Sequence, residues 1–196
     1  MENRVKQKKF VSLVLYLHNT QNEVVPFFQK VLPVFQDNFT NFEIVCVNDA
    51  CTDGTIGVLK EYLEENHCSE MVNIIHMSFF HGLESAMNAG RDLAIGDFIY
   101  EFDTAYVDYP SELIMEVYDK LLEGNDIVSA GTRDHVRMKS YKKHPGSFIF
   151  ATIKRAEEEE KSDRKLFGLF PGVQSTGSNP SGSIFHIEKQ FIPIAD

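Results

Sequence analysis

The segment FEIVCVNDACTDGT, residues 42–55, contains the pattern on which the predicted fold rests. Its first part, FEIVCV, is largely apolar, as in a strand that is covered on both faces. The polar pair Asn48-Asp49 ends this run, and Asp53-Gly54 is typical of a turn. Apolar residues then recur at helical spacing, at Ile56, Leu59 and Leu63. The segment therefore predicts a strand, a turn and a helix in succession.

The same alternation continues along the chain. Strands are expected at Phe10–Leu17, Phe42–Asp49, Met71–Met77, Asp97–Phe102 and Asp126–Gly131, with helices at Val24–Phe35, Ile56–Leu63, His81–Gly96 and Pro110–Gly124. We expect Pro33 to kink or end the first helix and Gly96 to stop the third. Alternating elements predict an α/β fold, with a Rossmann-like, mainly parallel sheet flanked by helices. Ligands bind such sheets at the carboxyl ends of the strands.

Composition narrows the class of protein. The 196 residues are 43% hydrophobic, which predicts one globular domain, 1–196, with a core at 10–133 and an acceptor-side or truncated C-terminal segment at 134–196. A net charge of −10 disfavours nucleic acid as a partner. Three cysteines, without a signal peptide or an apolar run of roughly 20 residues, predict a cytoplasmic protein, with peripheral contact at the inner membrane face as an open alternative.

Five motifs occur in an order that resembles one enzyme family. They are VSLVLYLHN, VNDACTDGT, HGLESAMNAGRDLAIGDFI, EFDTAYVDYPSELI and EGNDIVSAGTR, and they cover roughly residues 11–133. The set resembles family 2 glycosyltransferases of the GT-A fold, and within them the dolichyl- or polyprenyl-phosphate sugar synthases. The resemblance implies the GT-A (nucleotide-diphospho-sugar transferase) fold and a nucleotide-diphosphate sugar as donor.

The chemistry of such a donor defines the groups that its site needs. Negative charge develops on the leaving diphosphate, and a divalent cation or fixed positive groups must stabilise it. Mg²⁺ and Mn²⁺ prefer oxygen ligands, usually carboxylates and the phosphates themselves.

The resemblance also implies roles for particular residues. Asp49 would contact the nucleobase, Gly82 would allow close approach of the backbone, Asp103 would hold ribose or metal, and Arg133 would face the phosphates. The full nucleotide-sugar-binding set implied is Leu17, His18, Asn19, Asp49, Gly82, Asp103, Thr104 and Arg133. The catalytic base remains unassigned, since a polyprenyl-phosphate acceptor would hardly need one.

Several positions depart from the family pattern. Tyr16 stands for a proline, Asn48 for the first aspartate of a pair, and Phe80 for an asparagine. Ala105 stands where the family has its metal-binding aspartate, so Mg²⁺ or Mn²⁺ would depend on Asp103, with Asp108 as a candidate second ligand. Near the end, Ser183 stands where the family has an acidic residue.

Structural interpretations compete with these roles. Asp49 and Asp53 could cap the helix that follows them, and Asp108 is better explained as the N-cap of the helix at Pro110 than as a metal ligand. The basic segment 133–144 is expected to be a solvated loop. Its functional alternative is a contact with phosphate or anionic lipid.

Two functions of different classes follow. The first is transfer of a sugar from a UDP- or GDP-sugar to a lipid-phosphate or glycan acceptor, in the synthesis of cell-envelope polysaccharide or glycolipid. The second is a catalytically degenerate domain that binds nucleotide or acts as a partner of an active transferase. A nucleotidyltransferase is less well supported, because YLHNTQNE lacks the Gly-rich loop with Arg and Lys that such enzymes place after the first strand.

Overall fold

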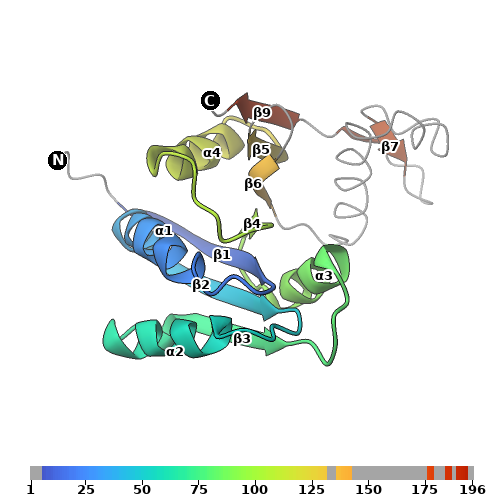
Figure 1. Cartoon of the computed structure of the whole chain (residues 1–196). Helices are drawn as coiled ribbons and strands as arrows, with labels where there is room; N and C mark the ends of the chain where they lie inside the picture. Colours follow the sequence, from blue (N-terminus) through green and yellow to red (C-terminus); the bar gives the residue numbers. More distant parts are fainter. Residues whose placement is uncertain (1–5, 132–135, 143–175, 179–183, 187–188, 194–196) are drawn as a thin grey trace.

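The computed structural model describes residues 6–131, 136–142, 176–178, 184–186 and 189–193. Its main sheet has the strand order β3-β2-β1-β4-β6-β5-β9, and β6 alone runs antiparallel to its neighbours (Figure 1). The strands are β1 (Gln7–Leu17), β2 (Phe39–Asn48), β3 (Val72–His76), β4 (Phe98–Phe102), β5 (Ile127–Gly131), β6 (Val136–Lys142) and β9 (Lys189–Pro193). A separate pair is formed by β7 (Thr176–Ser178) and β8 (Ile184–His186).

Helices cover both faces of this sheet. They are α1 (Val24–Asn38), α2 (Thr55–Glu65), α3 (Leu83–Leu93) and α4 (Glu112–Leu122), with a 3₁₀ turn at Ser69–Met71. Leu13 and Leu15 of β1 pack in a large core with residues of α1, α2 and α4, whereas Val14 packs in a smaller core with residues of α3. Because side chains alternate between the faces of a strand, α3 covers the face opposite to the other three helices.

The predicted alternation of strands and helices is confirmed, but Pro33 does not end α1 and Gly96 does not stop α3. α1 continues past Pro33 to Asn38, because proline removes one backbone bond while Leu32 and Phe35 remain buried in the core. α3 ends at Leu93, before Gly96. The Gly96 N–H donates to Ser12 Oγ at 2.8 Å, and a Cβ there would lie 2.5 Å from the Ser12 backbone nitrogen. Gly96 therefore allows close contact with β1 rather than stopping the helix.

The expectation of a solvated loop in the basic segment was wrong for residues 136–142. They form β6, which lies between β4 and β5 in the sheet. Met138 and Ser140 are fully buried. Val136, Met138 and Ser140 alternate with basic residues at period two, which is the pattern of a strand with one covered face. Residues 133–135 and 143–144 of this segment lie outside the described residues.

In the described part of the chain, no helix combines the length and the apolar character that a membrane crossing needs.

Gly90 of α3 lies directly against the sheet, and substitution with alanine should reveal this contact. A Cβ at position 90 would lie 2.4 Å from Val14 Cγ1 and 2.8 Å from Val47 Cγ2. We expect Gly90→Ala to lower the free energy of unfolding by about 1–3 kcal/mol, because overpacking outweighs the gain in helix propensity. Gly57→Ala in α2 is the control, since nothing lies within 4 Å of its added Cβ. Urea denaturation that shows equal effects for the two variants would contradict this packing.

Candidate functional site

The candidate site lies where the direction of the strand order reverses. From β1 the chain proceeds to β2 and β3 on one side, then returns to form β4 on the other side of β1. In open α/β sheets, ligands bind at the carboxyl ends of the strands at such a point. Leu15 of β1 pairs with Phe102 of β4, so Asp103 follows β4 at the same edge where Leu17 ends β1.

Asp49 connects three chain segments at this edge. Its side chain is fully buried. Oδ1 accepts the backbone N–H of His81 at 2.8 Å, and Oδ2 accepts the backbone N–H of Gly82 at 2.9 Å. The Tyr16 hydroxyl donates to Oδ2 at 3.1 Å. These bonds join the end of β1, the end of β2 and the loop before α3. Burial together with the bond to Asp49 raises the pKa of Tyr16 well above its ordinary value, so the phenol stays a donor.

The backbone of Asp49 orients His18. The Asp49 N–H donates to the Leu17 carbonyl at 2.9 Å, and His18 Nδ1 lies 2.7 Å from the Asp49 carbonyl oxygen. A carbonyl oxygen can only accept, so Nδ1 carries a proton and Nε2 of the neutral ring is an acceptor. The ring of Phe80 packs beside His18, with 4.6 Å between the ring centroids.

Asn19 and Asp53 fasten the loop after β1 to the loop after β2. Asn19 Oδ1 accepts the backbone N–H of Thr52 at 2.8 Å and of Asp53 at 3.3 Å. Asp53 accepts the N–H of Gln21 at 3.1 Å and of Thr55, the first residue of α2, at 3.0 Å. Although burial opposes it, hydrogen bonding from Thr55 and Gln21 holds the pKa of Asp53 below its ordinary value. The Oδ1 atom of Asn19 is therefore used to hold the two loops together.

The interpretation of Asp49 as a cap of α2 was wrong. The N-cap of α2 is Gly54, and the carboxylate of Asp49 points to the opposite loop. Ala50 follows Asp49 with φ 53°, a left-handed conformation that costs a residue with a Cβ about 1 kcal/mol. The bonds around Asp49 hold the chain in this turn.

Asn48 forms a link between the ends of β2 and β3. Its Nδ2 donates to His76 Nδ1 at 2.9 Å, and its Oδ1 accepts the N–H of Cys51 at 2.9 Å. The amide thus serves as donor and acceptor at once, which an ionised aspartate could not do. The departure from aspartate at this position therefore has a structural explanation.

The segment after β4 offers little for a metal held by protein alone. Asp103 and Thr104 are half-buried and Asp108 is exposed, whereas Ala105 is fully buried in the main hydrophobic core. Over the described residues, no group of three or more His, Cys, Asp or Glu could hold a metal. The arrangement fits a cation that shares one carboxylate with the phosphates of a ligand, since Mg²⁺ commonly binds one or two carboxylates plus substrate phosphates.

Asp108 is not the N-cap of the following helix, which corrects the sequence interpretation. The N-cap of α4 is Ser111. Tyr109 is buried against Phe102, with ring centroids 6.4 Å apart, and Lys30 Nζ lies 5.3 Å from the Tyr109 ring centroid. The buried Tyr109 ring holds the chain before Pro110. The helix begins at Glu112, four residues after Asp108, so Asp108 does not occupy the N-cap position. Arg133 and Ser183 lie outside the described residues.

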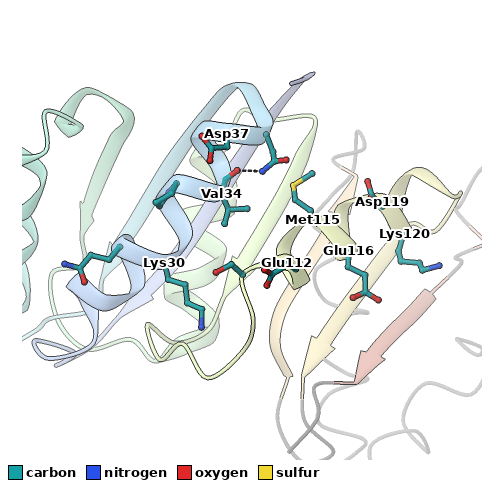
Figure 2. A pocket seen from close by; sticks show the side chains of 12 residues that line it. Lys30, Val34, Asp37, Glu112, Met115, Glu116, Asp119 and Lys120 are labelled. Atoms are coloured by element: carbon teal, nitrogen blue, oxygen red, sulfur yellow. Dashed lines mark hydrogen bonds between the residues drawn. The ribbon is translucent and has the colours of Figure 1, made fainter. Parts of the chain in front are cut away.

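A separate groove of about 660 Å³ lies between α1 and α4 (Figure 2). Its charged lining residues are Asp37, Glu112, Glu116, Asp119, Lys30 and Lys120. Lys120 is paired with Glu123 at 2.9 Å, so the lining is predominantly acidic. An acidic lining disfavours a diphosphate, and the groove shares no residue with the site at the strand ends.

Comparison with known proteins identifies the family of this chain. The family model described as "Glycosyl transferase family 2" matches residues 12–178. The chain belongs to glycosyl transferase family 2. An uncharacterized glycosyltransferase of Synechocystis sp. is 31% identical over 148 residues, which are 76% of this chain and 45% of that protein. A bactoprenol glucosyl transferase of Shigella flexneri is 31% identical over 127 residues, 63% of this chain and 39% of its own.

Further relatives extend the same family. An undecaprenyl-phosphate 4-deoxy-4-formamido-L-arabinose transferase of Serratia proteamaculans is 25% identical over 162 residues, which are 82% of this chain and 48% of that protein. This family 2 chain thus spans less than half the length of these relatives.

Solved structures of glycosyltransferases show the same GT-A fold. A mannosyltransferase from Pyrobaculum calidifontis, in complex with GDP-Man and Mn²⁺, superposes with a TM-score of 0.60 at 16% identity, over 69% of this chain and 45% of that one. The glucosyl-3-phosphoglycerate synthase of M. tuberculosis gives a TM-score of 0.50 at 13% identity, over 62% and 44%. The predicted fold class is therefore confirmed.

Removing the charge of Asp49 should destabilise the strand-end site strongly. In Asp49→Asn, the new amide N–H groups would face donors that now bond to the carboxylate. We expect a loss of about 3 kcal/mol or more in the free energy of unfolding, because two backbone donors cannot both be satisfied. Tyr16→Phe removes one donor and leaves the charge, so its loss should be about 1–3 kcal/mol. Chemical denaturation measures both. Equal, small losses would show that the carboxylate does not hold these loops.

Proposed function

We propose that this chain is the donor-binding domain of a glycosyltransferase that takes a UDP- or GDP-sugar and transfers the sugar to a lipid-phosphate or glycan acceptor. The observation that carries the proposal is the position of Asp103 and His18 at the reversal between β1 and β4, where a GT-A sheet offers its ligand crevice. Membership of family 2 supports the reaction class. The reaction would release a nucleoside diphosphate as its leaving group.

The diphosphate would lie near Asp103. Asp103 would hold a divalent cation, which when bound would stabilise the charge of the departing diphosphate. Gly82 is proposed to let a ligand approach the backbone closely, since it has no side chain. Its φ of 84° is also one that a residue with a side chain rarely adopts. Arg133 is proposed as a phosphate contact on the sequence pattern alone.

A lipid phosphate is the acceptor that best suits this family 2 chain. Two relatives carry bactoprenol or undecaprenyl-phosphate in their names. A phosphate acceptor is already ionised at neutral pH, so it needs no general base to remove a proton. Such an acceptor would bring the domain to a membrane surface, with the basic segment 133–144 as the proposed contact.

The proposal is tested by the metal dependence of nucleotide binding. Mn²⁺ or Mg²⁺ alone should leave the melting temperature unchanged, because a single carboxylate binds a hard cation weakly. UDP or GDP with the metal should raise it by a few degrees, since a ligand at 100 times its dissociation constant adds about 2.7 kcal/mol. Asp103→Asn should abolish the effect of the metal. Asp108→Asn, which removes an exposed acid five residues later, is the matched control.

Three outcomes would change the assignment. Loss of the metal effect in Asp108→Asn but not in Asp103→Asn would move the cation site to Asp108. A shift with nucleotide that EDTA leaves intact would show binding without a cation. No shift with UDP, GDP or their sugars would overturn donor binding and favour the non-catalytic domain.

A further inference from the structure

The loop between β3 and α3 presents an unusual set of aromatic rings. Phe79 and Phe80 are 64% and 58% exposed. The Phe79 ring stacks on His81 with 3.9 Å between centroids, whereas the Phe80 ring packs beside His18 at 4.6 Å. Phe80 thus extends from its own loop to the end of β1, which is the strand at the reversal point. Figure 1 shows this loop on the same side as the carboxyl ends of β1 and β2.

The loop that carries these rings is held in place. The N–H groups of His81 and Gly82 both donate to the buried carboxylate of Asp49. Gly82 then begins α3 as its N-cap, with φ 84°. Because the buried charge holds the loop in place, the loop cannot move to bury the exposed apolar ring. Such a ring is available to contact a ligand or a partner.

We propose that Phe80 is a donor-binding residue that stacks on the nucleobase, and that Asp49 positions its loop instead of contacting the base. This inference rests on the proposed function, because it assigns the base end of the same donor. Asp49 is fully buried and its two oxygens already accept three hydrogen bonds. The family resemblance implies that Asp49 contacts the nucleobase. In this proposal, Phe80 and His18 make that contact instead.

The chemistry of the two rings suits a nucleobase. An exposed phenyl face can stack on any planar base, whatever hydrogen-bond donors and acceptors that base carries. In its neutral form His18 adds an acceptor, because its Nδ1–H is bonded to the Asp49 carbonyl and Nε2 then carries a lone pair. Uracil and guanine each carry a ring N–H that such an acceptor can bind.

A lipid chain is the competing occupant of an exposed pair of phenylalanines. The contact of Phe80 with His18 directs its ring to the strand-end site, where the donor is proposed to bind. The Phe79 ring instead stacks on His81 within its own loop. The base is therefore the occupant to test.

Isothermal titration calorimetry of the full chain should measure the affinity for UDP, for GDP and for pyrophosphate, each with Mn²⁺. Comparing these affinities separates the contribution of the base from that of the diphosphate. Phe80→Ala should weaken the binding of the preferred nucleoside diphosphate about tenfold and leave pyrophosphate unchanged. Phe80→Tyr should restore the affinity, since it keeps the aromatic face. Phe79→Ala, which removes a similarly exposed ring from the same loop, is the control and should bind like the wild type.

The outcomes separate this inference from the proposed function. If the wild type binds UDP or GDP and Phe80→Ala binds equally well, the base does not stack on Phe80 and the donor proposal stands. If the wild type binds neither nucleotide, both fail. If Phe79→Ala and Phe80→Ala lose binding to phosphatidylcholine vesicles together and keep nucleotide affinity, the rings contact lipid and the inference is overturned.

Discussion

The strand-end site depends on the hydrogen bonds that the buried carboxylate of Asp49 accepts. A charge taken out of water is costly unless donors surround it, and here three donors come from two other segments, the end of β1 and the loop before α3. The same carboxylate therefore holds all three donors in position. Tyr16, where the family pattern has proline, adds the third donor. A departure from the family pattern thus strengthens the site's framework.

Departures at other positions have equally local causes. Asn48 uses both ends of its amide, one on His76 and one on the Cys51 backbone. Ala105 is packed in the main core. Together, these contacts hold the loops at the strand ends, and Asp103 is the residue proposed above as the cation ligand.

Much of the fold could be predicted because strand and helix periods are local properties. The run Phe10–Leu17 and the helical spacing after Gly54 both correspond to observed elements. β6 was missed because its basic residues suggested solvent, although its period of two was visible. In the site, motif order placed Asp103 and His18 at the strand ends. The hydrogen bonds to the Asp49 carboxylate could not be predicted, because the donors His81 and Gly82 are more than thirty residues away and donate through backbone N–H groups.

The most direct test of this account is amide hydrogen exchange at His81 and Gly82, measured by NMR on the unliganded chain. Both lie in a connecting loop, where amides ordinarily exchange quickly. Because their N–H groups donate to a buried carboxylate, we expect protection comparable to that of the neighbouring strand β2. Exchange of both amides at the rate of an open loop, with β2 still protected, would contradict the central role of Asp49.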